Sequence, residues 1–205
     1  MSRNYAGLSR ERIIIEALHI IAGRGLGGLS MRRLGDALEV EAMAIYHHFP
    51  LGKEQLFNAI AAYVTSPGPG AGALDDPEAR ESEQAAEDGE PAGASEPGPW
   101  DARITAWAEA YRARLLEFSG ALSLLAHRAP RTPHSLATRA LVEGALGEAG
   151  LTGPDVERAA DALYSYCLGA VVHQVRHQQE EDAPDAAEAD ARFRYGLRAL
   201  LAGLV

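Results

Sequence analysis

The sequence predicts an all-α protein made of a small N-terminal helical domain, an acidic connector and a larger C-terminal helical domain. Apolar residues recur with the 3.6-residue period of an amphipathic helix through most of the chain, and no stretch alternates every second residue as a strand would. Of the 205 residues, 47% are apolar, which is enough for a substantial core. The expected domains are residues 1–64, 65–99 and 100–205.

Four helices are expected in the N-terminal domain. Ser9 can cap the first helix, and Gly25 with the glycines after it ends that helix. Ser30 can cap a short second helix, a third helix follows after only two residues, and a fourth begins near Lys53. Two short helices joined by a tight turn between two further helices form a helix-turn-helix unit, whose second helix enters the major groove of DNA.

The connector differs from the rest of the chain in composition. The segment from Thr65 to Trp100 contains six prolines and six glycines, and residues 65–99 carry one basic side chain against nine acidic ones. Such a segment buries too little apolar surface to offset an ordering cost of roughly 1–2 kcal/mol per residue. We therefore expect it to be flexible. A second acidic stretch, residues 180–190, is expected to be a loop between the last two helices.

The C-terminal domain shows four helical patterns. One covers Ile104 to Leu115, one follows Pro133, and a longer one follows the Gly153-Pro154 pair. The last places Phe193 and four leucines on one face. The two final helices are apolar enough to need a packing partner.

Charge and cysteine content narrow the classes of function. The net charge of −10 argues against a nucleic-acid partner, but residues 1–64 carry seven basic against six acidic side chains, so the acidity lies elsewhere. No signal peptide or run of eighteen apolar residues is present, and we expect a cytoplasmic protein. Cys167 is the single cysteine, which excludes an internal disulfide and a thiolate zinc site and indicates a core residue.

The third helix and its flanks, "EVEAMAIYHHF" at residues 39–49, contain the candidate DNA-binding residues. Val40 and Ile45 are expected to pack inward. The start of the helix then faces the groove, where small apolar side chains can meet thymine methyl groups, through Glu41, Ala42, Met43 and Ala44. The end of the helix offers donors to phosphate oxygens or the groove edge, through Tyr46, His47 and His48.

The segment "LSMRRLGDALEVEAMAIYHHFPLGKEQLFNAI" resembles the DNA-binding domain of the tetracycline-repressor (TetR) family, over about residues 8–64. The resemblance implies that phosphates are held by Tyr46, His48 and Lys53, with Ser30 and Arg32 supporting them. The chain departs from the family pattern twice. Glu39 stands where the family turn usually has glycine, and "FPLGK" is one residue longer than the usual spacing before the lysine.

The C-terminal domain resembles the regulatory domain of the tetracycline repressors themselves, in "LLAHRAPRTPH" (124–134), "ALYSYCLGAVVHQ" (162–174) and "FRYGLRALLAGL" (193–204). This implies a homodimer that releases double-stranded operator DNA when a small-molecule effector binds. Candidate pocket residues are Trp107, Tyr111, His127, Tyr164, Tyr166 and His173. Candidate dimer-interface residues are Leu163, Ala170, Phe193, Leu197, Leu200, Leu201 and Leu204.

Two other classes of function stay open. A helical metal-dependent enzyme could use His127, His134, His173 or His177, since His173 and His177 lie four apart on a helix and His127 matches a magnesium ligand of the tetracycline repressors. No nucleophile elbow, phosphate loop or paired carboxylates support catalysis, so we expect neither an enzyme nor a cofactor or bound metal. The turn departures and the acidity also suit an interaction protein that has lost DNA binding.

Overall fold

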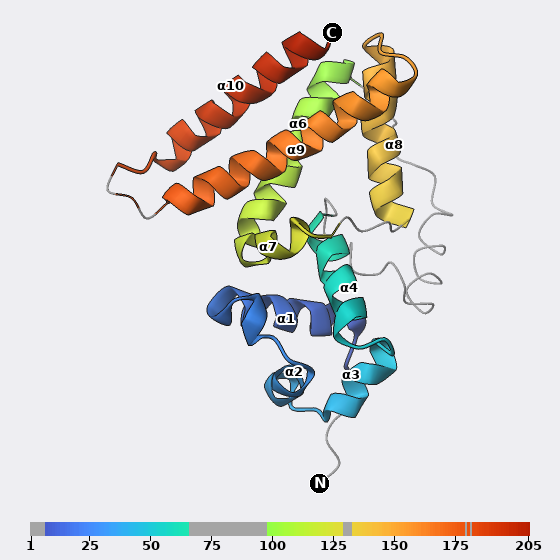
Figure 1. Ribbon diagram of the computed structural model, residues 1–205, viewed down its shortest axis with the longest axis vertical. Helices are drawn as coiled ribbons and strands as arrows, with labels where there is room; N and C mark the ends of the chain where they lie inside the picture. Colours follow the sequence, from blue (N-terminus) through green and yellow to red (C-terminus); the bar gives the residue numbers. More distant parts are fainter. Residues whose placement is uncertain (1–6, 66–97, 129–132, 179, 181) are drawn as a thin grey trace. The chain divides into compact units, whose positions relative to one another are not determined.

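A computed structural model describes residues 7–65, 98–128, 133–178, 180 and 182–205. All regular elements within these residues are helical, which confirms the predicted fold class (Figure 1). They form two compact units, the first from the described residues of 1–91 and 120–135 and the second from those of 92–119 and 136–205. The predicted connector lies almost wholly outside the described residues.

The first unit contains the expected N-terminal helices. These are α1 (Arg10–Arg24), the 3₁₀ turn η1 (Leu26–Gly28), α2 (Met31–Leu38), α3 (Ala42–His48) and α4 (Lys53–Thr65). Two short later elements, η2 (Ser119–Ala121) and α7 (Leu122–Leu125), follow in the chain, and α7 packs against α4. We did not predict α7 or its packing.

The predicted caps position these helices. Ser9 Oγ accepts a hydrogen bond from the Arg12 amide at 3.1 Å, and Ser30 Oγ accepts one from the Arg33 amide at 3.1 Å. Gly25 ends α1 at a φ of 69°, with its amide bonded to the Ile21 carbonyl. Each cap satisfies a terminal backbone group that the helix itself leaves unpaired.

The core of the first unit is apolar and closely packed. The largest fully buried side chains in it come from α1, α2, α3 and α4 and from the turns between them, and they are Ile13, Ile21, Leu29, Leu34, Ile45, Phe49, Leu56 and Ile60. All three leucines that α7 contributes, Leu122, Leu124 and Leu125, are also buried. The short helices α2 and α3 are therefore fixed by packing, since neither is long enough to be stable alone.

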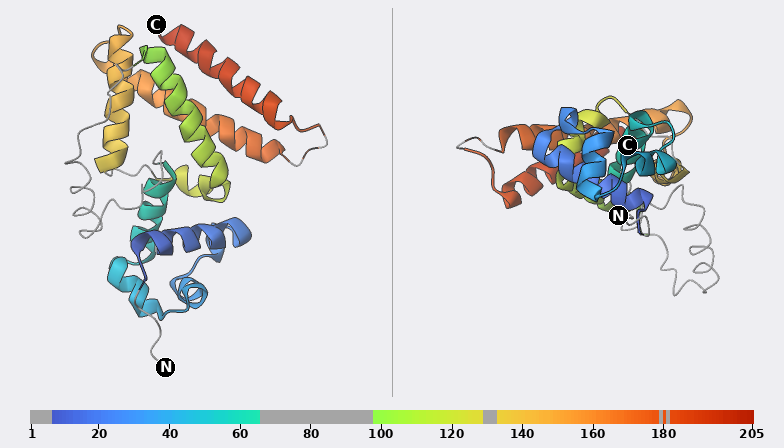
Figure 2. Two further views of the ribbon diagram at one scale, coloured as in Figure 1. Left: turned by 180° about the vertical axis from the view of Figure 1, so that it is seen from behind. Right: turned by 90° about the horizontal axis from the view of Figure 1, so that it is seen from below.

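The second unit consists of α6 (Trp100–Glu117), α8 (Pro133–Glu148), α9 (Pro154–His177) and α10 (Ala186–Leu204). Helix α9 crosses α6, and α10 runs back along α9, as both views show (Figures 1 and 2). The centre of this packing is formed by the fully buried side chains Ile104, Ala108, Leu115, Leu163, Cys167 and Val171. None of the described helices is long and apolar enough to cross a membrane.

The acidic stretch 180–190 is only partly the loop that we expected, because α10 already begins at Ala186. Asp185 is its N-cap, and Asp185 Oδ1 accepts a hydrogen bond from the Glu188 amide at 2.8 Å. Acidic side chains stabilise the first turn of a helix because they face its positive dipole end. The prediction was wrong because we took acidity as a loop signal where it starts a helix.

Candidate nucleic-acid interface and ligand cavity

Helix α3 exposes one face and buries another. Met43 is 63% exposed and Tyr46 is 39% exposed, and His47 is exposed beside them. These three residues lie at positions i, i+3 and i+4, so they share one side of the helix. Val40 and Ile45 are buried, which confirms that they pack inward.

The other residues that were predicted to face the DNA groove lie on different sides of α3. Glu41 is exposed at the N-cap and makes no capping bond with its side chain, and Ala42 is half-buried. Ala44 is only 2% exposed, so its side chain lies in the core and not on the outer face. The outward prediction for Ala44 was wrong, because the buried stripe of a helix includes adjacent positions and Ala44 shares it with Ile45.

The turn before α3 brings α2 very close to it. The Val40 amide bonds to the Gly35 carbonyl at 2.9 Å, and a Cβ placed on Gly35 would lie 2.9 Å from the Val40 carbonyl oxygen. Glu39 has a φ of 57° and a ψ of 32°, the left-handed conformation that glycine adopts at lower cost. Glu39 thus adopts here the backbone conformation for which glycine is best suited.

The extra residue before Lys53 is accommodated in a tight turn. The Gly52 amide bonds to the Phe49 carbonyl at 2.8 Å, and Gly52 has a φ of 67°. A Cβ on Gly52 would lie 3.2 Å from Tyr46 Cε1, so the turn packs directly against the exposed tyrosine. Lys53 then begins α4, with its Nζ 5.0 Å from the centre of the Phe57 ring.

Two basic side chains lie exposed on α2. Arg32 is exposed, and Arg33 is exposed and donates to the Gly28 carbonyl. Ser30 is exposed at the start of the helix, where its hydroxyl serves as the cap. Glu39 and Glu41 lie between α2 and α3, so positive charge comes from a few side chains and not from a strongly basic surface.

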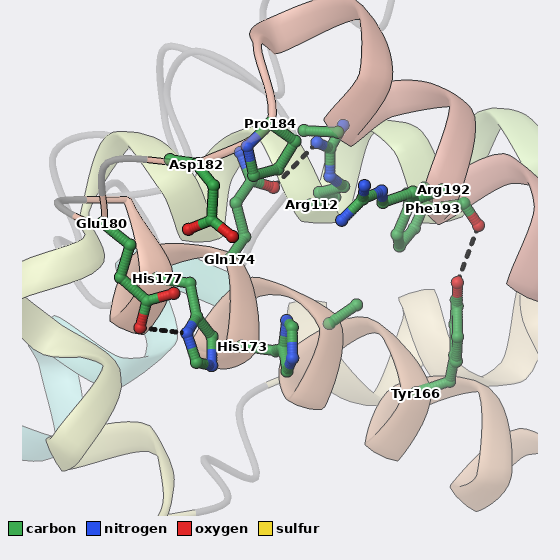
Figure 3. A pocket seen from close by; sticks show the side chains of 13 residues that line it. Arg112, Tyr166, His173, Gln174, His177, Glu180, Asp182, Pro184, Arg192 and Phe193 are labelled. Carbon is green, nitrogen blue, oxygen red and sulfur yellow. Dashed lines mark hydrogen bonds and ion pairs between the residues drawn. The ribbon is translucent and has the colours of Figure 1, made fainter.

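The second unit holds a cavity of about 300 Å³ between α6, α9, α10 and the segment joining the last two helices (Figure 3). Arg112 lies in its wall, with Nη1 2.7 Å from Asp190 Oδ1 and Nη2 2.8 Å from Gln174 Oε1. Tyr166 donates its hydroxyl to the Phe193 carbonyl at 2.7 Å. His173 and His177 stand one turn apart on α9 along the same cavity.

The other predicted pocket aromatics form a separate cluster between α6 and α9. The Trp107 ring stacks on Tyr111 at 5.6 Å, and Tyr164 meets both rings edge-on at 4.8 and 5.5 Å. Burial raises the pKa of Tyr111 and raises that of Tyr164 to about 12, so both phenols are neutral. The Trp107 indole N–H is buried and has no acceptor among the described residues.

The predicted pocket residues of the second unit are therefore not brought together in one place. Trp107, Tyr111 and Tyr164 form the cluster, Tyr166 and His173 line the cavity, and His127 is exposed in the first unit. Tyr164 and Tyr166 are divided because residues two positions apart on α9 lie about 200° apart around the helix.

The predicted dimer residues are also divided. Leu163, Phe193, Leu197 and Leu201 are at most 7% exposed and pack within their own chain. Ala170, Leu200 and Leu204 are half-buried and remain partly available to a second copy. An apolar helix face indicates that a partner exists, but it does not indicate whether that partner belongs to the same chain.

In the described part of the chain, no group of three or more His, Cys, Asp or Glu side chains could hold a metal ion. His173 and His177 have ring centres 4.5 Å apart, and His177 Nδ1 lies 2.6 Å from Glu180 Oε1. The side chain of His134 lies outside the described residues.

Two family models match most of the chain. The model of bacterial regulatory proteins of the tetR family matches residues 13–60, and that of the tetracyclin repressor-like C-terminal domain matches residues 91–189. The chain belongs to the TetR family. Its members are DNA-binding transcriptional regulators.

Two curated relatives agree with this membership. An HTH-type transcriptional regulator of Saccharopolyspora erythraea is 28% identical over 98% of this chain and 77% of its own length. The HTH-type transcriptional repressor DrrR1 of Streptomyces coeruleorubidus is 26% identical over 89% of this chain. The match spans only 60% of DrrR1, so DrrR1 is substantially longer than the matched region.

Solved structures show the same fold. A possible TetR-family regulator from Streptomyces coelicolor A3(2) has a TM-score of 0.70 and 26% identity, over 96% of this chain and 98% of its own. The S. coelicolor protein ActR, in complex with actinorhodin, has a TM-score of 0.71 at 21% identity, over 97% and 96% of the two chains. At that identity, ActR shows the fold alone.

Sequence reasoning missed two arginines of this TetR-family regulator. Arg112 is buried, with 9% of its surface exposed. The sequence feature that could have revealed it is a charged residue on the same helix face as the apolar Ala108 and Leu115. Arg128 follows α7, donates to Asn58 Oδ1 at 2.7 Å and to Glu54, and lies 5.4 Å from the centre of the Phe57 ring. No local pattern signals the contacts of Arg128, because its partners are about seventy residues away.

Proposed function

We propose that this TetR-family regulator is a dimeric repressor that binds an inverted-repeat operator and releases it when a small molecule binds in the second unit. The observation that carries the DNA-binding part is the outward face of α3, formed by Met43, Tyr46 and His47 above a buried Ala44 and Ile45. A short helix held from behind and exposed in front suits insertion into a major groove. The relative DrrR1 is itself a repressor, which supports repression over activation.

Within that face the side chains differ in the contact they can make. Tyr46, beside the turn that leads to Lys53, offers a hydroxyl to phosphate oxygens, and the neighbouring His47 and His48 offer ring nitrogens. Met43 and Ala42 offer apolar surface, which suits contact with thymine methyl groups. Phosphate contacts set overall affinity, whereas base contacts set preference.

Binding-site selection from a random duplex pool tests this assignment. Tyr46→Phe should weaken binding to all duplexes by about 1 kcal/mol, the worth of one hydrogen bond, and should leave the selected sequence unchanged. Met43→Ala should change the selected sequence. If both variants selected the wild-type sequence with equal losses of affinity, α3 would not be the element that reads bases.

For the effector, we propose the cavity beside Arg112, Tyr166 and His173. Its volume of about 300 Å³ lies at the lower end of the range for small-molecule pockets, and it combines rings with a few polar groups. The aromatic cluster is the second candidate, because the Trp107 indole N–H has no acceptor among the described residues and an effector could supply one.

Calorimetry with wild type, His173→Ala and Trp107→Ala distinguishes the two candidates. Actinorhodin is a suitable first probe because it occupies the fold relative ActR, and thermal-shift screening extends the search to other small polycyclic compounds. Loss of affinity in His173→Ala alone supports the cavity, and loss in Trp107→Ala alone moves the site to the cluster. A tenfold loss of operator affinity needs about 1.4 kcal/mol of coupling, and the operator must weaken the effector equally. Equal effector affinity with and without operator would refute release.

The alternative is an interaction protein that has lost DNA binding, and the same binding-site selection tests it. Its basis was the altered turn and the acidity of the chain. The turn forms with Glu39 in the left-handed conformation, and Val40 and Ile45 on either side of the start of α3 are buried. Failure of the full chain to enrich any duplex at low salt would favour it.

A further inference from the structure

The end of α3 is held by an arginine from a different helix. Arg10, the first residue of α1, donates from Nη1 to the backbone carbonyl of His48, the last residue of α3. Its guanidinium also lies 4.4 Å from the centre of the Phe49 ring, which is fully buried. One side chain thus makes a polar and a stacking contact at the same helix end.

These contacts are suited to fixing a short helix. The last carbonyl groups of a helix have no partner within it, and its C-terminus carries the negative end of the helix dipole. A guanidinium donates a hydrogen bond to such a carbonyl group, and its positive charge interacts favourably with the negative end of the dipole. Its planar face adds a cation–π contact with Phe49. The Phe49 amide bonds to the Ile45 carbonyl at 2.9 Å, so the capped end is continuous with the buried part of α3.

The position of Arg10 is otherwise unfavourable. It lies in the first turn of α1, directly after the Ser9 cap, where the helix dipole favours acidic side chains over basic ones. Arg12, two residues later on the same helix, is subject to the same effect, and among the described residues its guanidinium donates to the nearby Gly7 carbonyl at 3.4 Å. The distant contacts of Arg10, 38 residues away in sequence, are therefore what distinguishes the two arginines.

We propose that Arg10 is a positioning residue for DNA recognition, which fixes the end of α3 that carries Tyr46, His47 and His48. This inference rests on the proposed function of α3. We call the contacts of Arg10 with the His48 carbonyl and the Phe49 ring the clamp. Without the clamp, α3 keeps its buried residues, but its C-terminal end becomes more mobile relative to α1. The loss should fall mainly on sequence-specific binding, because base contacts require a defined helix position whereas non-specific binding depends on total charge.

The experiment compares full-length wild type with Arg10→Met, Arg10→Lys and the matched control Arg12→Met. Both methionine variants lose one positive charge from the same helix, but only one loses the clamp. The probes are a duplex selected by the wild type from a random pool and a scrambled duplex of the same composition. Affinities are measured by fluorescence anisotropy over a range of salt concentrations, well below the melting temperature of each variant.

We expect Arg10→Met to bind the selected duplex about tenfold more weakly than Arg12→Met, the loss expected for one hydrogen bond to a charged group. Both should bind the scrambled duplex alike and show the same salt dependence. Arg10→Lys, which retains the charge and can donate to the carbonyl but cannot stack as a plane, should fall between wild type and Arg10→Met.

Three results would overturn the inference. Equal affinities of the two methionine variants for the selected duplex would show that the clamp does not matter. A salt slope lower by about 0.9 in Arg10→Met than in Arg12→Met would make Arg10 a direct phosphate contact. Equal loss on both duplexes with a lowered melting temperature would indicate a purely structural role. If the wild type enriched no duplex at all, the proposed function itself would fail.

Discussion

Glu39 has a left-handed backbone conformation that costs a residue with a side chain roughly 1–2 kcal/mol. Glycine at this position would avoid most of this cost. Because glycine has greater freedom in the unfolded chain, however, folding would lose roughly 0.5–1 kcal/mol more conformational entropy. The turn is retained because the Glu39 and Val40 amides bond back to carbonyls of α2 and because Leu38 and Val40 are buried on either side.

Glu39→Gly should therefore stabilise the protein by about 0.5–1 kcal/mol in urea unfolding. Ala37→Gly is the control, because Ala37 is exposed in a regular turn of α2, and it should destabilise by about 1 kcal/mol. Destabilisation by both substitutions would mean that the glutamate side chain contributes more than the backbone conformation costs.

Cys167 is fully buried, and burial raises its pKa from 9.0 to about 12. The unfolded chain releases this proton above about pH 9 whereas the folded chain retains it, so stability should fall as pH rises from 9 toward 12. The slope approaches about 1.4 kcal/mol per pH unit for one such group.

Unfolding measured between pH 8 and 11 checks this fall, and Tyr164, whose pKa is raised to about 12, should add to it above pH 10. Cys167→Ala should reduce the slope between pH 9 and 10. Native protein should also resist a thiol reagent at pH 8 that labels the unfolded chain at once. Rapid labelling of the native protein would show that the thiol is accessible.

Among the elements, α2 and α3 depend on one close approach. Gly35 is buried where the two helices meet, and an added Cβ would lie 2.9 Å from the Val40 oxygen and 3.3 Å from the Ala42 nitrogen. Both neighbours are backbone atoms, one in the turn and one at the start of α3, so they cannot move aside as the end of a side chain can.

Gly35→Ala should destabilise the protein by about 1–3 kcal/mol, the usual cost of overpacking, and should also weaken DNA binding because α3 is displaced. Gly23→Ala is the matched control. Gly23 lies in α1 with nothing within 4 Å of an added Cβ, and the change should be neutral or stabilising by up to about 1 kcal/mol. A stable Gly35→Ala variant with normal DNA affinity would show that the turn can relax without cost.

For the whole molecule, dimerisation determines how DNA is read. The exposed aromatic Tyr195, at 71% exposure on α10, lies on the helix that also presents the half-buried Leu200 and Leu204. A dimer related by a two-fold axis presents two α3 helices, so its half-sites should be separated by about 34–36 Å, one turn of DNA, or by a multiple of this.

Sedimentation at micromolar concentration should therefore show a dimer, and the duplexes selected by the protein should be inverted repeats. Tyr195→Arg should favour the monomer and reduce operator affinity, while its melting temperature at high protein concentration should fall toward that of the monomer. A wild-type monomer, or selected sites without two-fold symmetry, would contradict the dimer.

The sequence by itself determined the helical class and the caps and ends of the N-terminal helices, and it singled out α3 as the candidate DNA-reading helix. These depend on local chemistry: serine caps at Ser9 and Ser30, a terminating glycine at Gly25, and a 3.6-residue apolar period. The side of α3 that faces outward also followed from this period for Met43 and Tyr46. Ala44 was placed on the wrong side, because it lies next to the buried Ile45 in a stripe that includes adjacent positions, and its small side chain gives little apolar signal.

Only the tertiary structure decided which partner each apolar or charged side chain has. Phe193 and Leu197 lie in the chain's own core, Tyr111 and Arg112 serve different sites from neighbouring positions, and Arg10 reaches α3 across 38 residues. The reason is physical: periodicity records that one face of a helix is buried, since burial acts on each residue locally. It does not record what covers that face, because the partner is set by how the whole chain packs.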